Sequence, residues 1–87
     1  MLTTQNLNTI DSEGIYIQRS NSNAILSRNY PIEKAGFLEV SSSPDKMYVL
    51  QRYTSYEGEI TYTRSKYNGN WLSWYVFSGE KSSFNSL

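Results

Sequence analysis

The sequence contains no cysteine and no histidine, and it has only two prolines. The first absence excludes disulfide cross-links, and the second removes the commonest protein ligand of zinc and other transition metals. Alanine, the strongest helix former, occurs only at Ala24 and Ala35. A chain of 87 residues buries only about 60–65% of its unfolded surface. Without cross-links or a transition metal, such a domain is expected to depend on large side chains or on neighbouring subunits.

The sequence also lacks a net charge of either sign and has no long apolar runs. Eight basic and eight acidic residues cancel, so no basic stripe is present to hold a phosphate backbone, and we expect no nucleic-acid partner. No apolar run approaches the length of a membrane span, so we expect no membrane insertion. The first ten residues are polar and lack the hydrophobic region of a signal peptide. No glycine-rich phosphate loop occurs, and we expect no cofactor.

Aromatic side chains are abundant instead. Eight tyrosines, three phenylalanines and two tryptophans make up 15% of the residues. Each of these side chains can bury about 150–250 Å², and aromatic residues favour strands over helices. The composition therefore predicts a single small all-β domain, poor in helix. We expect an antiparallel meander of about five strands or a small sandwich.

Five segments have the β-branched and aromatic residues that are typical of strands. They are residues 15–18, 35–40, 47–53, 60–64 and 71–77. The irregular segment Arg19–Lys34 is predicted to be a long surface loop. Turns are predicted at Ser41–Asp45 and Tyr56–Glu59. Leu7 and Ile10 could fix the N-terminal segment onto the domain.

The dipeptide Asn68-Gly69 lies between two strand-like runs and is typical of a two-residue type I′ turn. Regular pairing away from that turn places Lys66 opposite Trp71 and Thr63 opposite Trp74. In this register neither face of the hairpin is plainly polar. Either both faces are covered, or a bulge shifts the register.

Four groups of motifs follow one another along the chain: Asn6–Ile10 with Gly14–Ile17, Tyr30–Val40 with its Ala35-Gly36, the strand end Tyr53-Thr54, and Ile60–Arg64 with Asn68–Trp71, Ser73-Trp74 and Phe77. Taken in this order, they resemble the pyocin-knob family of phage and R-type pyocin tail fibres. The resemblance covers about residues 6–77 and implies an antiparallel β module in a homotrimeric fibre of an extracellular virion tail. Residues 1–5 would be a lead-in and residues 78–87 a polar exit linker. The family supplies no catalytic residue.

The sequence offers little support for catalysis or for a metal site. Without histidine or cysteine, a serine nucleophile would need a lysine as its base, and no such pairing is evident. Glu57 and Glu59 could form the carboxylate pair of a glycosidase, but charges that keep a hairpin tip soluble are the preferred interpretation. Calcium needs six or more oxygen ligands, and no loop around Asp11, Glu13 or Asp45 is acidic enough to supply them. We therefore expect no enzyme activity and no metal.

The last hairpin carries the best candidate for a ligand site. Sugars are bound by aromatic rings, which cover their C–H faces, together with polar groups that bond their hydroxyls. Four residues of this hairpin have that character: Trp71, Tyr67, Arg64 and Asn70. Trp71 would stack on a pyranose, while Arg64 and Asn70 would bond its hydroxyls. The competing interpretation places Trp71 in the core, as is preferred for Trp74, and a contact between Lys66 and the Trp71 ring would then be a structural cation–π interaction.

Three functions are compatible with this sequence. The first is receptor binding, in which the module contributes to host attachment through a bacterial surface polysaccharide or lipopolysaccharide. The second is a passive module that stabilises a trimeric fibre through contacts between subunits. The third and most distant is a small glycan hydrolase. An exposed aromatic platform would favour the first function, an apolar patch on the surface the second, and a cleft with two close carboxylates the third.

Overall fold

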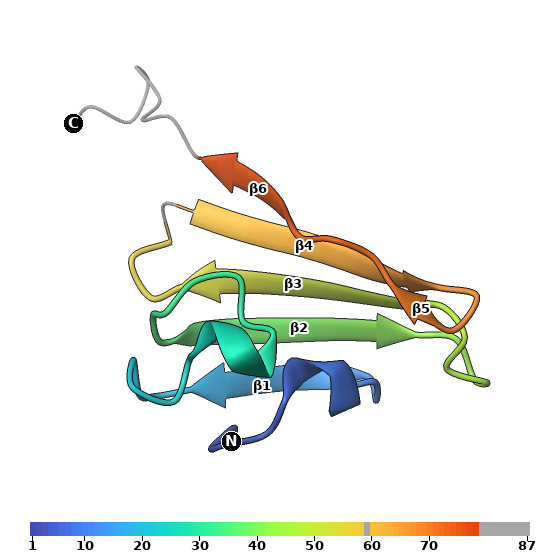
Figure 1. The fold of residues 1–87 in the computed structure, drawn as a ribbon, viewed down its shortest axis with the longest axis horizontal. Helices are drawn as coiled ribbons and strands as arrows, with labels where there is room; N and C mark the ends of the chain where they lie inside the picture. The colour runs from blue at the N-terminus through green and yellow to red at the C-terminus, as the bar shows by residue number, and fades with distance from the viewer. Residues whose placement is uncertain (59, 79–87) are drawn as a thin grey trace.

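A computed structural model of the chain describes residues 1–58 and 60–78. These residues form a six-stranded antiparallel sheet in which β1 to β5 follow one another and β6 pairs with β4 (Figure 1). The strands are β1 (Gly14–Gln18), β2 (Gly36–Ser42), β3 (Val49–Ser55), β4 (Ile60–Tyr67), β5 (Asn70–Trp71) and β6 (Tyr75–Ser78). The described helices are two short 3-10 segments, η1 (Leu7–Thr9) and η2 (Leu26–Arg28), and no helix of these residues is long and apolar enough to cross a membrane. The predicted antiparallel, helix-poor fold is confirmed.

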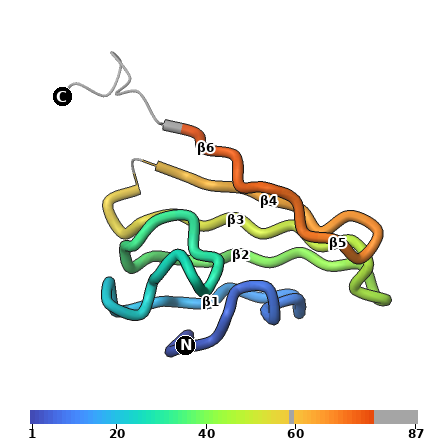
Figure 2. Tube along the Cα trace, in the orientation of Figure 1, coloured from blue at the N-terminus to red at the C-terminus, as the bar shows by residue number. Residues whose placement is uncertain are grey.

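One face of the sheet is covered by two segments of the same chain. The N-terminal segment with η1 and the long β1–β2 connection with η2 lie on this side (Figures 1 and 2). The side chain of Gln51 in β3 ties down the first segment, because its amide nitrogen donates to the carbonyls of Leu7 and Ile10, each at 2.8 Å. The long loop that the sequence predicts at the surface, Arg19–Lys34, therefore also covers the core.

The core lies between this face and the two covering segments. Its central residues are fully buried or nearly so: Leu2, Leu7, Ala24, Tyr30, Leu38, Val40, Val49 and Tyr53. The rings of Tyr30 and Tyr53 meet edge to face with centroids 5.4 Å apart. Both hydroxyls have partners, since Tyr53 donates to the Lys34 carbonyl at 2.7 Å and Tyr30 accepts from Gln18 at 2.9 Å. Large aromatic rings thus fill a thin core, and each of the two buried tyrosine hydroxyls has a hydrogen-bond partner.

The last hairpin has the predicted turn and a register shift. Asn68 and Gly69 have φ angles of 51° and 82°, as a type I′ turn requires, and Lys66 pairs with Trp71. Farther from the turn, Thr63 pairs with Tyr75 rather than with Trp74. One extra residue is therefore accommodated between β5 and β6, and this bulge is one of the two alternatives that the sequence left open. It also explains why six strands are present instead of about five.

Candidate functional site

Arg64 lies in the middle of β4 and points toward the covered face. Its side chain is buried, with the residue only 4% exposed, and its Nε donates to the Gln51 Oε1 at 2.8 Å. The guanidinium carbon lies 4.0 Å from the ring centroid of Trp71 and 4.7 Å from that of Trp74. Loss of hydration lowers the pKa of Arg64 to about 10. The two indoles and one amide thus surround a structural cation that is not presented to solvent.

The two tryptophans are half-buried and packed against the core. Their indole nitrogens donate to backbone carbonyls, Trp71 to Asn8 at 3.2 Å and Trp74 to Asn29 at 3.0 Å. The Lys66 Nζ lies 5.8 Å from the Trp71 ring centroid, so the anticipated cation–π contact is present. These bonds fasten the last hairpin to both covering segments.

Tyr67 and Asn70, the other two predicted site residues, are exposed at the turn. Tyr67 is 64% exposed and its ring lies 5.5 Å from that of Tyr48. The amide nitrogen of Asn70 reaches the Asn68 carbonyl at 3.4 Å. In the alternation of β4, Tyr67 belongs to the opposite face from Arg64. The structure therefore does not bring the four residues together around one ligand.

The acidic residues singled out in the sequence are dispersed. Glu57 is exposed and its carboxylate lies 4.0 Å from the Lys34 Nζ, while Glu59 lies outside the described residues. Asp11 pairs with Lys46 at 3.3 Å. Hydrogen bonds from the Ser43 hydroxyl and from a backbone amide lower the pKa of Asp45. Within residues 1–58 and 60–78, no three acidic side chains gather in a way that could hold a metal ion.

The other face of the sheet, which we call the open face, carries no covering segment within the described residues. Register places its side chains in rows across the strands, such as Ile17, Phe37, Thr54, Thr61 and Phe77. Many of its large side chains are exposed: Ile15, Ile17, Phe37, Leu50, Tyr75 and Phe77. An exposed apolar face of this extent is typical of an interaction surface.

The open face has two different ends. At the apolar end, Met1, Ile15, Ile17, Arg19, Phe37 and Tyr56 line a hollow of about 440 Å³. The rings of Phe37 and Tyr56 lie 5.2 Å apart there. Farther along the strands, Glu39 and Arg52 approach to 4.0 Å. The apolar end thus offers hydrocarbon and ring surface, with the guanidinium of Arg19 at the hollow.

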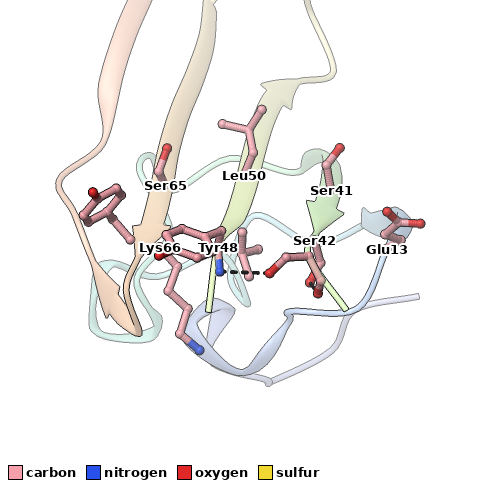
Figure 3. A pocket seen from close by; sticks show the side chains of 10 residues that line it. Glu13, Ser41, Ser42, Tyr48, Leu50, Ser65 and Lys66 are labelled. Atoms are coloured by element: carbon pink, nitrogen blue, oxygen red, sulfur yellow. Dashed lines mark hydrogen bonds between the residues drawn. The ribbon is translucent and has the colours of Figure 1, made fainter. Parts of the chain in front are cut away.

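At the tyrosine end, a second hollow of about 460 Å³ is open to solvent (Figure 3). Ser41, Leu50 and Ser65 stand side by side on β2, β3 and β4, because they are partners in the strand register. The hollow is completed by Glu13, Ser42, Ser43, Tyr48, Val49, Lys66 and Tyr67. Of the predicted site residues, only Tyr67 lines it. The sequence signal that could have found the others is the alternation of β2 and β3, which puts Ser41 and Leu50 on the face opposite the core.

Comparison with known proteins shows which kind of protein contains a sheet of this architecture. No protein-family model matches the chain, and no curated protein matches it. Among solved structures, the R1 pyocin fibre of P. aeruginosa (C-terminal residues 323–701) matches 92% of the chain at 26% identity with a TM-score of 0.78. The R2 pyocin fibre of P. aeruginosa (residues 323–691) matches 88% at 30% identity with a TM-score of 0.75. An N-truncated R2-type pyocin tail fibre matches 98% at 27% identity with a TM-score of 0.77.

The matched segments are parts of longer fibres. This chain spans 21% of the R1 and R2 fibre chains and 34% of the N-truncated one. The chain therefore has the architecture of a structural module of tail-fibre proteins. More particularly, it is similar over nearly all its length to one segment of the R-type pyocin fibre, which confirms the resemblance to pyocin-knob domains.

Proposed function

We propose that the chain is a non-enzymatic module of a phage-type tail fibre and contributes to the attachment of that fibre to bacterial surface glycan. The similarity to R-type pyocin fibres carries the first part of this proposal. The open face supports the second part, because tyrosine rings and serine hydroxyls lie exposed on it. Such a module works outside the cell, on the virion or a virion-like particle.

Several observations support a binding role rather than hydrolysis. The matched proteins are fibres, and the chain has no histidine or cysteine to activate a nucleophile. The Glu57 carboxylate is exposed and lies 4.0 Å from the Lys34 Nζ, as expected of a charge that keeps a hairpin tip soluble.

A glycan array run in parallel on this chain and on an intact fibre that contains it tests the attachment role. We expect weak binding by the single chain, with a Kd of about 0.1–1 mM, and stronger binding by the fibre through multivalency. A matched fibre from which this module has been removed serves as the control. Glycan binding that is identical with and without the module would contradict the proposal.

A second role is supported by the apolar end of the open face. We propose that this end packs against neighbouring copies and stabilises a homotrimer, because it exposes Phe37 and its neighbours to water in a single copy. Because only one end of one sheet face would take part in each copy, association of the isolated chain is expected to be weak.

Light scattering over a range of concentrations tests this role. We expect a monomer at low micromolar concentration and a trimer as the concentration rises. Phe37→Glu should abolish the trimer, whereas Leu50→Glu at the tyrosine end should leave it intact. The two side chains are a matched pair, at 42% and 45% exposure. A tight trimer at low micromolar concentration, or equal effects of the two variants, would contradict the expectation.

A further inference from the structure

The hollow at the tyrosine end has room for a small ring. Its volume of about 460 Å³ lies within the roughly 300–1,000 Å³ of small-molecule sites. Leu50 lies between the two serines, and the rings of Tyr48 and Tyr67 meet at 76° beside them. Because the two rings are steeply inclined to each other, they form a corner. A ligand can stack on one ring while the other ring lies beside it.

Polar groups around this corner are available to a ligand. Among the described residues, no hydrogen-bond partner is present for the hydroxyls of Ser41, Ser65, Tyr48 and Tyr67. In contrast, Ser42 donates to the Ser43 carbonyl at 2.9 Å. Tyrosine and serine together are an effective binding surface, because tyrosine supplies rigid amphipathic area and serine supplies adaptable hydrogen bonds.

The charges of the hollow indicate the class of ligand. Glu13 and Lys66 are the charged residues among those that line it, but the alternation of β4 directs the Lys66 side chain to the covered face, so the hollow concentrates no positive charge. The Lys66 ammonium lies near the Trp71 ring, and no carboxylate of the described residues pairs with it. In the described part of the chain, a phosphate or uronate would meet the Glu13 carboxylate, with no cation directed into the hollow and no arginine guanidinium to pair with. A neutral ligand with one apolar face and many hydroxyls suits this surface better.

We infer that the hollow formed by Ser41, Tyr48, Leu50, Ser65 and Tyr67 binds a single neutral pyranose unit of a surface glycan. This inference rests on the proposed attachment function and names its site. The pyranose stacks its C–H face on a tyrosine ring and exchanges hydrogen bonds with the serine and tyrosine hydroxyls. Trp71 and Arg64 take no part, since they belong to the opposite face of the sheet.

Amide chemical shifts of the whole chain, titrated with methyl glycosides, test the site directly. The probes are the neutral methyl pyranosides of glucose, galactose, mannose, rhamnose and N-acetylglucosamine, with inorganic phosphate and methyl glucuronide as charged comparisons. We expect saturable shifts around residues 48–50 and 65–67 for at least one neutral probe, with a Kd of about 1–10 mM. Tyr67→Ala should weaken this binding about tenfold, and Tyr67→Phe should retain most of it. Tyr75→Ala is the matched control, because Tyr75 is 67% exposed on the same face but does not line the hollow.

Three results would overturn the inference. They are saturable shifts that map elsewhere, binding unchanged in Tyr67→Ala, and a preference for phosphate or glucuronide over every neutral probe. Repeating the glycan array with a fibre carrying Tyr67→Ala separates the site from the function. Array binding that survives Tyr67→Ala refutes this site and leaves the attachment role standing, whereas no array binding by any fibre that contains the module refutes both.

Discussion

Replacing Trp71 with alanine should destabilise the domain, even though the residue is only partly buried. The indole covers the guanidinium of Arg64 at 4.0 Å and donates to the Asn8 carbonyl at 3.2 Å. Removing it would uncover part of the core, break the bond to the N-terminal segment and expose a buried cation to water on one side. All three effects act on the folded state.

The expected loss is about 3–4 kcal/mol. A fully buried aromatic residue costs about 3–5 kcal/mol when truncated to alanine, and a half-buried one about half as much. A hydrogen bond adds about 1 kcal/mol and a partly desolvated cation–π contact about as much, although these contributions are not strictly additive. Total stabilities of small domains are roughly 5–10 kcal/mol, so this single change would remove a large part of the free energy of unfolding.

Urea unfolding followed by far-UV circular dichroism measures this loss without relying on the deleted fluorophore. Tyr67→Ala is the control, because Tyr67 is a large aromatic residue close to the same turn but 64% exposed, and it should change the free energy of unfolding by less than about 0.5 kcal/mol. Trp71→Phe should fall between the two, since it keeps a ring but loses the N–H donor. A loss below about 1 kcal/mol in Trp71→Ala would refute the structural role of this residue and restore it as a candidate for ligand stacking.

Three further changes test other parts of the fold. Gly36→Ala should cost about 3 kcal/mol or more in thermal unfolding, because an added Cβ would lie 2.3 Å from the Thr54 carbonyl oxygen; an unchanged melting temperature would contradict this close approach. Gln51→Leu should cost about 3–5 kcal/mol in urea, because it leaves the Arg64 cation without its hydrogen-bond acceptor and frees the N-terminal segment, and a neutral effect would show that the amide is dispensable. Burial raises the pKa of Tyr53 above its usual value near 10, so its contribution to stability is complete below pH 10 and is lost as the pH rises beyond that value. Unfolding measured from pH 9 to 12 should therefore show a steep loss of stability that is reduced in Tyr53→Phe, and equal slopes would contradict the assignment.

The local features of the fold follow from the sequence, and the reason is stereochemical. Asn-Gly favours positive φ at both positions, so the turn at Asn68-Gly69 could be placed without knowledge of the rest of the chain. The strands at 14–18 and 36–42 were recognisable from β-branched and aromatic residues within one or two positions of their ends. The place of the bulge could not be predicted, because Leu72, Ser73 and Trp74 fit either register equally well.

The surroundings of the predicted site residues follow less well from the sequence, because they depend on burial rather than on residue type. Arginine is rarely buried without an acidic partner, so its side chain was expected at the surface. What buries Arg64 is the pair of indoles, and Trp74 joins this pair only because the bulge turns it to the covered face. The hollow at the tyrosine end cannot be read from the sequence for a related reason. Its residues come from three strands that are brought together by pairing across the sheet, and no local motif connects them.

Within the described residues the sheet is covered on one side only, and this has a consequence for how such domains can diverge. The central buried residues lie on one face or in the segments above it, whereas the open face contributes little to the packed interior. Substitutions on the open face are therefore nearly free of folding constraints, apart from keeping strand-forming residues there. A lineage can exchange one set of side chains for another on this face and so acquire a new target while retaining the same scaffold. Sequence variation among relatives is expected to concentrate at positions such as 41, 48, 50, 65 and 67, while the residues around Arg64 stay fixed.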